Sequence, residues 1–125
     1  MTYTVTIPKR TDYAFDLGKF GRRITTCNPD AQVWFNRGLI WAYGFNHKES
    51  AVCFEQAITH DESCAMAYWG LAYALGPNYN QPWELLGADL NIVVQRTYHA
   101  AQKAQSLAAN ATPMEQALIS AIQDR

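Results

Sequence analysis

Apolar residues recur at intervals of three and four along most of the chain, which predicts a succession of amphipathic helices. The first spans residues 29–43, and its apolar face carries four residues: Ala31, Trp34, Gly38 and Trp41. Asn28 followed by Pro29 is typical of a helix start, because asparagine caps free N–H groups and proline at the first helical position forfeits no hydrogen bond. Gly44 is predicted to end this helix.

Four further helices follow from the same spacing and from their start signals. They span about residues 47–60, 63–75, 88 or 89 to 108, and 113–125. Asn46 with Glu49, and Thr112 with Glu115, have the spacing of a capping box, in which two side chains satisfy N–H groups reciprocally. The sequence therefore predicts an all-α domain over residues 29–125, built from antiparallel helix pairs.

The first 28 residues do not share this helical period. They begin with an alternating β-branched run that ends at Pro8, and they continue through two glycines and mixed charges. We expect residues 1–28 to form an extended N-terminal arm, with residues 9–27 packed irregularly across the first helix pair.

The chain also repeats itself at an interval of 34 residues. The paired positions are Trp34 and Tyr68, Phe35 and Trp69, Gly38 and Ala72, Leu39 and Tyr73, and Trp41 and Leu75. Between the two copies lies a small–aromatic–small pattern formed by Ser50, Phe54 and Ala57. Aromatic residues of the first copy are matched by aromatic residues at the equivalent positions of the second, and a small residue is matched by a small one. This pattern predicts stacked structural repeats.

This spacing resembles the tetratricopeptide repeat, in which helix A carries W-x2-L-G-x2-Y and helix B carries A-x3-F-x2-A. The resemblance covers roughly residues 29–108 and departs at Arg37, where an apolar residue is usual. It implies a right-handed superhelix of antiparallel helix pairs. The implied units are a repeat at 29–62, a repeat at 63–111 with an insertion at 77–87, and a final helix at 112–125.

A narrower resemblance is carried by residues 42–47, 64–70, 74–80 and 111–119. These segments are similar to the N-terminal part of longer bacterial and fungal tetratricopeptide proteins. That likeness implies that the natural protein extends beyond Arg125, and it supplies no catalytic residue.

Composition and charge reduce the classes of partner that the protein is expected to bind. A net charge of −1 and a pI near 6.3 provide no basic field for nucleic acid or anionic lipid, and no apolar run is long enough for a membrane span. Without a signal peptide, a cytoplasmic protein is expected. The three cysteines are odd in number and favour reduced, packed thiols over a disulfide framework.

Catalytic and metal chemistry find little support in the sequence. The possible metal ligands are His47, Cys53, His60 and Cys64, but Cys53 and His60 are seven residues apart on one helix, or about 10 Å along its axis. No hydrolase, phosphate-loop or zinc motif occurs, so no metal or cofactor is predicted and binding is favoured over catalysis. A small-molecule site or enzyme near His47 and the 77–83 loop stays open as an alternative.

The favoured function is binding of an apolar peptide or partner helix in an aromatic concave groove. The predicted lining is Phe35, Leu39, Tyr43, Trp69 and Tyr73, and the predicted rim is His47, Tyr79, Asn80 and Trp83. The resemblance implies that chaperone-binding members use a lysine and an asparagine where Phe35 and Leu39 stand, so a carboxylate clamp is not expected. Two alternatives remain: residues 1–27 or a later helix cover these aromatics, or the chain self-associates through Met114, Leu118 and Ile122.

Overall fold

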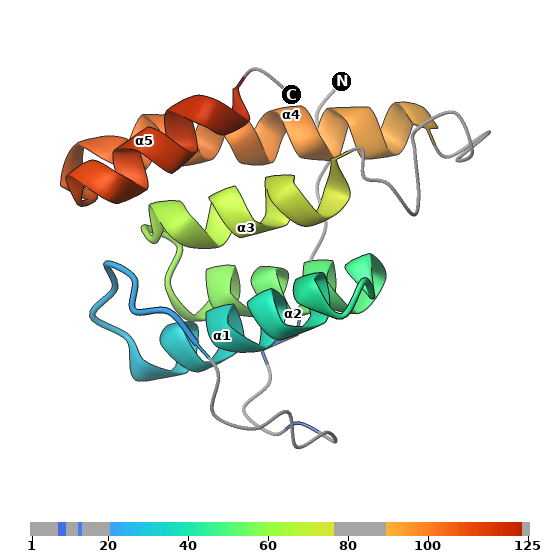
Figure 1. Cartoon of the computed structure of the whole chain (residues 1–125), viewed down its shortest axis with the longest axis horizontal. Coiled ribbons are helices and arrows are strands. Elements are labelled where there is room, and N and C mark those ends of the chain that lie inside the picture. Colours follow the sequence, from blue (N-terminus) through green and yellow to red (C-terminus); the bar gives the residue numbers. More distant parts are fainter. Residues whose placement is uncertain (1–7, 10–12, 14–20, 77–89, 124–125) are drawn as a thin grey trace.

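The structure, a computed structural model, describes residues 8–9, 13, 21–76 and 90–123 of the chain. Its helices are α1 (Pro29–Tyr43), α2 (His47–His60), α3 (Ala65–Leu75), α4 (Leu90–Leu107) and α5 (Pro113–Ile122), with a 3-10 turn at Ala108–Asn110 (Figure 1). The described residues contain no strand, so the all-α prediction is confirmed. The predicted insertion at 77–87 and most of the predicted arm lie outside the described residues.

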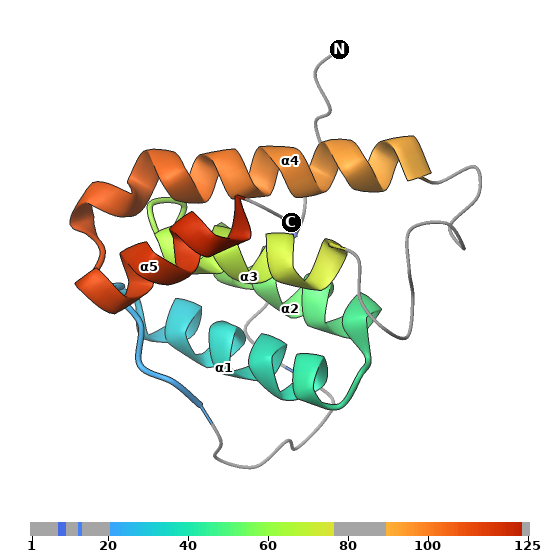
Figure 2. The same ribbon diagram turned by 45° about the horizontal axis from the view of Figure 1, so that its top comes forward.

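The helices pack mostly antiparallel in sequential pairs. The most extensive contacts join α1 to α2, α3 to α4, and α2 to α3. Figures 1 and 2 show α3 between the α1–α2 pair on one side and α4 with α5 on the other. Because α3 touches all four other helices, it forms the centre of the bundle.

The predicted start signals act as expected at α1 and α5, and Asn46 caps α2 by accepting a hydrogen bond from the Glu49 backbone N–H at 3.2 Å. Asn28 Oδ1 accepts hydrogen bonds from the backbone N–H groups of Asp30 at 2.9 Å and Ala31 at 3.1 Å, which caps α1. At α5, Thr112 and Glu115 form the complete reciprocal capping box. Helix α3 begins at residue 65, two residues later than predicted. The Asp61 carboxylate accepts hydrogen bonds from the backbone and the hydroxyl of Ser63, which holds this segment in a turn.

Helix α1 ends at Tyr43 with Gly44 as its C-cap, as predicted. Gly44 has an ordinary φ of −82°, and it is Phe45 that adopts the left-handed conformation, with φ 63°. The backbone N–H of Phe45 donates to the Ala42 carbonyl at 3.1 Å, and that of Asn46 donates to the Trp41 carbonyl at 2.9 Å. These two bonds form a Schellman motif, whose left-handed position is usually glycine. A side chain at that position costs about 1–2 kcal/mol.

The core is built around the Phe54 ring, which is fully buried between α1 and α3. A Cβ atom at Gly38 would lie 2.7 Å from the ring, and one at Gly70 would also lie closer than 3.0 Å, a separation that real Cβ atoms essentially never show. Phe35 packs against the same ring edge-on, with centroids 5.4 Å apart. A close approach is therefore present at Gly38, in the first repeat copy, and another is present at Gly70 on α3.

Tyr13 packs against the first helix pair, whereas residues 10–12 and 14–20 lie outside the described residues. Its hydroxyl donates to Glu49 Oε1 at 2.7 Å and accepts from Trp41 Nε1 at 2.6 Å. Burial, reinforced by hydrogen bonds with its neighbours, raises the pKa of Tyr13, so the hydroxyl keeps its proton. The Arg37 guanidinium lies over the rings of Tyr13 and Trp34, at 4.7 and 4.5 Å from their centroids. This stacking explains a cation where the predicted repeat has an apolar residue.

Candidate functional site

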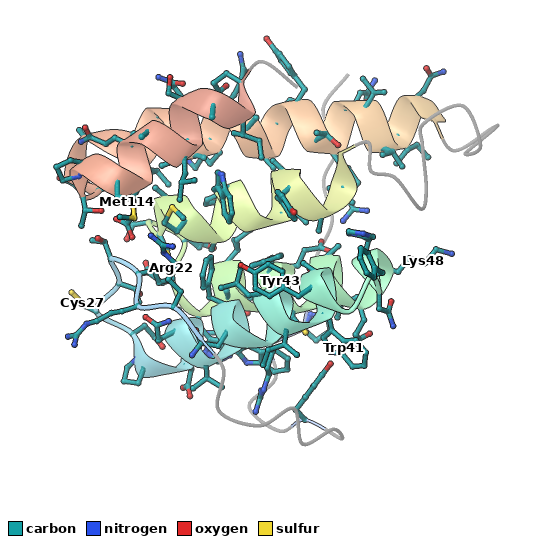
Figure 3. The ribbon with its side chains drawn as sticks, viewed as in Figure 1. Arg22, Cys27, Trp41, Tyr43, Lys48 and Met114 are labelled. Atoms are coloured by element: carbon teal, nitrogen blue, oxygen red, sulfur yellow. The ribbon has the colours of Figure 1, made fainter. Side chains whose placement is uncertain are left out.

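Five aromatic residues of α1 and α3 keep accessible surface, and they are Trp41, Tyr43, Tyr68, Trp69 and Tyr73. We call three of them, Tyr43, Trp69 and Tyr73, the aromatic face. Trp69 and Tyr73, one turn apart on α3, stack with ring centroids 5.5 Å apart and an interplanar angle of 24°, and both are half-buried. Tyr43 is 61% exposed, and in Figure 3 its side chain extends from the C-terminal part of α1 toward α3. Since α3 contains no charged residue, this surface is suited to apolar and aromatic groups.

The prediction that Phe35 and Leu39 line an open groove is wrong. Phe35 is 0% exposed and Leu39 is 5% exposed, and both belong to the core. The physical reason is that α1 packs against α3 as well as α2, so a wider arc of its surface is buried than one partner helix would require. Of the five predicted lining residues, the aromatic face retains three.

The predicted rim is only partly described. His47 lies half-buried in the first turn of α2, whereas Tyr79, Asn80 and Trp83 lie outside the described residues. The possible small-molecule site that combined His47 with the 77–83 loop is therefore not tested by the structure.

The residues proposed for self-association are mostly turned inward. Ile122 is 6% exposed and Leu118 is half-buried, so only Met114, at 60% exposed, offers substantial surface. The Arg22 guanidinium reaches the Met114 sulfur, and Figure 3 shows the two labelled side chains together. Contact between two copies through all three residues would require α5 to leave its present packing.

An open cleft of about 950 Å³ lies where residues 22–28 meet the first turn of α5 and the turn before α3. Within it, the buried Glu115 carboxylate accepts hydrogen bonds from the Thr25 hydroxyl at 2.6 Å, the Thr25 backbone at 2.9 Å and the Thr112 backbone at 2.9 Å. Burial would raise the pKa of Glu115, but these bonds outweigh it and the pKa is lowered. Asp61, also in the cleft, accepts from Thr26 at 2.5 Å.

These carboxylates are engaged in holding the N-terminal segment to the bundle, which makes their role structural. Sequence reasoning missed the cleft because Thr25 and Glu115 are 90 residues apart in the chain. The capping box at Thr112 was the one signal that placed Glu115 at a helix start, but it did not indicate that the Glu115 carboxylate also binds Thr25.

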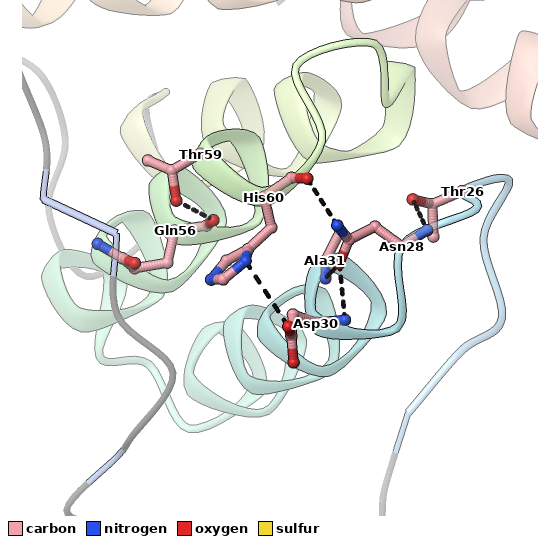
Figure 4. A network of polar contacts seen from close by, with 7 residues as sticks. All are labelled: Thr26, Asn28, Asp30, Ala31, Gln56, Thr59 and His60. Atoms are coloured by element: carbon pink, nitrogen blue, oxygen red, sulfur yellow. Dashed lines mark hydrogen bonds and ion pairs between the residues drawn. The ribbon is translucent and has the colours of Figure 1, made fainter.

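A second polar network joins the start of α1 to the end of α2 (Figure 4). The Asn28 amide donates to the His60 carbonyl at 2.9 Å, and His60 Nδ1 lies 3.9 Å from Asp30 Oδ2.

Burial raises the pKa of the Cys64 thiol to about 11, which opposes formation of a thiolate ligand or nucleophile. Among the described residues there is no group of three or more histidine, cysteine or acidic side chains able to hold a metal ion.

Fold and site together define an all-α protein of sequentially paired helices with an accessible aromatic face. Comparisons with protein-family models, with curated proteins and with solved structures found no match to this chain. Within the part of the chain that the structure describes, every helix is too short or too polar to cross a bilayer.

Proposed function

We propose that this protein is an interaction module of the tetratricopeptide type, a right-handed stack of helix pairs that binds an apolar segment of a protein partner on its aromatic face. The proposal rests on two separate features, the repeat-like packing of the helices and the chemistry of the accessible surface.

The packing supports the repeat assignment. Phe54 of α2 fits against glycines of the two neighbouring helices, Gly38 on α1 and Gly70 on α3. Ser50, at the small position of the helix B pattern, is fully buried and its hydroxyl donates to the Gly38 carbonyl at 2.7 Å. At Gly38, small and aromatic residues thus meet where the repeat pattern predicts that adjacent helices approach one another, while Gly70 lies two residues before the corresponding position, Ala72.

The observation that carries the binding proposal is the accessible aromatic face on an uncharged helix. Tyrosine and tryptophan dominate the energetics of protein interfaces, because each supplies a large apolar area and a polar tip. The stacked pair Trp69–Tyr73 is already ordered in the unbound chain, which reduces the entropy that binding must overcome. An apolar peptide or helix with few charges fits this surface best.

Selection of a random 12-residue peptide library against the immobilised chain tests the proposal. The affinity of the enriched peptide is then measured by fluorescence anisotropy for the wild type, Tyr43→Ala and Tyr98→Ala. Tyr98 on α4 is 58% exposed, close to the 61% of Tyr43, so it is a matched control. We expect Tyr43→Ala to weaken binding at least 10-fold, equivalent to about 1.4 kcal/mol, with Tyr98→Ala unchanged.

Trp69→Ala provides the second measurement, and we expect about a 30-fold loss of affinity if this residue is the central anchor. Its melting temperature is recorded alongside, because the half-buried indole also contributes to packing. A library that yields no apolar or aromatic consensus would count against the proposal. Equal affinities for the wild type and all three variants would rule out the aromatic face.

A further inference from the structure

The corner between α1 and α2 exposes an aromatic residue in a backbone conformation that the fold would assign to glycine. Phe45 has φ 63° and is 68% exposed, so its ring contributes little to the core. The corner itself is well ordered by hydrogen bonds, since both N–H groups of the Schellman motif donate to α1 carbonyls.

The fold alone does not account for phenylalanine at this position. Gly44 stands one residue earlier with an ordinary φ of −82°, where any residue fits, while Phe45 occupies the left-handed position. Exchanging these residue types would relieve the backbone strain and leave the buried core unchanged. Strain that the fold does not require is found at functional positions, where the side chain makes a contact outside the molecule.

We propose that Phe45 is an anchor for the same protein partner, inserting its ring into an apolar pocket whose rim carries an acidic side chain. The inference rests on the proposed function, because Phe45 lies two residues after Tyr43 of the aromatic face and both side chains are exposed. The charge of the rim follows from Lys48, which is exposed in the first turn of α2 and extends outward in Figure 3. The neighbouring Glu49 carboxylate is occupied by the Tyr13 hydroxyl.

Phe45→Gly separates binding from folding, because the two effects have opposite signs. The variant loses the ring and gains a residue suited to φ 63°, so its melting temperature rises by about 3–6 °C. Its affinity for the library-selected peptide falls at least 10-fold. Val33→Ala is the matched control: Val33 is 43% exposed on α1, and its replacement removes apolar surface and raises helix propensity. Val33→Ala should bind as the wild type does.

Lys48→Gln tests the acidic rim. The affinity of the wild type for the selected peptide should fall between 50 and 500 mM NaCl, and the variant should lose most of that salt dependence. An unchanged salt dependence in Lys48→Gln overturns the acidic rim.

The variants also distinguish the two proposals. Loss of binding in Tyr43→Ala with full binding in Phe45→Gly overturns the corner anchor and leaves the aromatic face. Loss in Phe45→Gly with full binding in both Tyr43→Ala and Trp69→Ala supports the corner and overturns the aromatic face. A Phe45→Gly variant that melts lower than the wild type would show that the ring supports the fold, which overturns the inference.

Discussion

Adding one methyl group at Gly70 probes the contact on which the packing depends. In Gly70→Ala the new Cβ atom would lie closer than 3.0 Å to the Phe54 ring, so the ring or helix α3 has to move. The ring is fully buried and is also approached by Gly38 from α1, which leaves it little room. Alanine gains about 1 kcal/mol of helix propensity over glycine, and overpacking costs about 1–3 kcal/mol. We expect a net loss of up to about 2 kcal/mol.

The effect of the same substitution should reverse when the ring is smaller. Phe54→Leu replaces the rigid ring, whose Cδ1 and Cε1 atoms lie nearest to the new methyl group, by a smaller side chain that can rotate away from it, at a cost of roughly 1–2 kcal/mol by itself. In that background Gly70→Ala keeps its helix-propensity gain and helps to fill the vacated space, so it should stabilise by up to about 1 kcal/mol. The resulting coupling energy between the two sites is about 2 kcal/mol.

Urea unfolding followed by circular dichroism gives the four free energies of this double-mutant cycle. Phe54→Leu is preferred to Phe54→Ala, because an alanine would cost about 3–5 kcal/mol of a total that is typically about 5–15 kcal/mol. Gly44→Ala is the control, since a Cβ atom there meets only the Ile40 carbonyl oxygen at 3.4 Å and the Trp41 oxygen at 3.6 Å. If Gly70→Ala costs the same in both backgrounds, the close approach to the ring is not what requires glycine.

Three further predictions test the attachment of the N-terminal segment and the state of the thiols. Folding lowers the pKa of Glu115 below its ordinary value of 4.5. The ionised carboxylate therefore stabilises the folded state fully above about pH 4.5, and this contribution is lost as the pH falls through the folded-state pKa. Glu115→Gln should therefore unfold about 1–3 kcal/mol more easily at pH 7 and show a flatter acid profile in urea titrations. Ellman's reagent should label the exposed Cys27 rapidly in the native chain and the buried Cys64 only on unfolding. Tyr13→Phe should cost about 1–3 kcal/mol by calorimetry, because it removes a partly buried hydroxyl that both donates and accepts while leaving the ring under Arg37.

Local signals carried most of the fold prediction. Helix starts at Asn28 and Thr112 follow from capping chemistry that involves residues within three positions, and both are present. The left-handed residue after α1 was harder to predict, because glycine is usual at that position but Phe45, not Gly44, adopts this conformation. The start of α3 was misplaced because a hydrogen-bonded turn at Asp61 has the same polar composition as a helix N-terminus.

The functional residues were harder to predict than the helices, because their placement depends on distant parts of the chain. The link between Thr25 and Glu115 leaves no periodic trace in the sequence. For α1, the spacing of apolar residues identified a buried face but not its width. Phe35 and Leu39 are buried because α3 packs beside α2 on the same helix, and a three- and four-residue period cannot show how many neighbours a helix has.

The central position of α3 gives the aromatic face its significance. A helix that is apolar around its whole circumference normally has neighbours on every side, and seven residues of α3 are indeed buried. Trp69 and Tyr73 nevertheless keep part of their surface accessible, although they belong to the helix with the least polar character in the bundle. Exposure of the apolar surface of this stacked pair to water is unfavourable. An apolar partner segment would bury that surface, as most of α3 is already buried. Binding at this face would thus continue the packing that forms the fold.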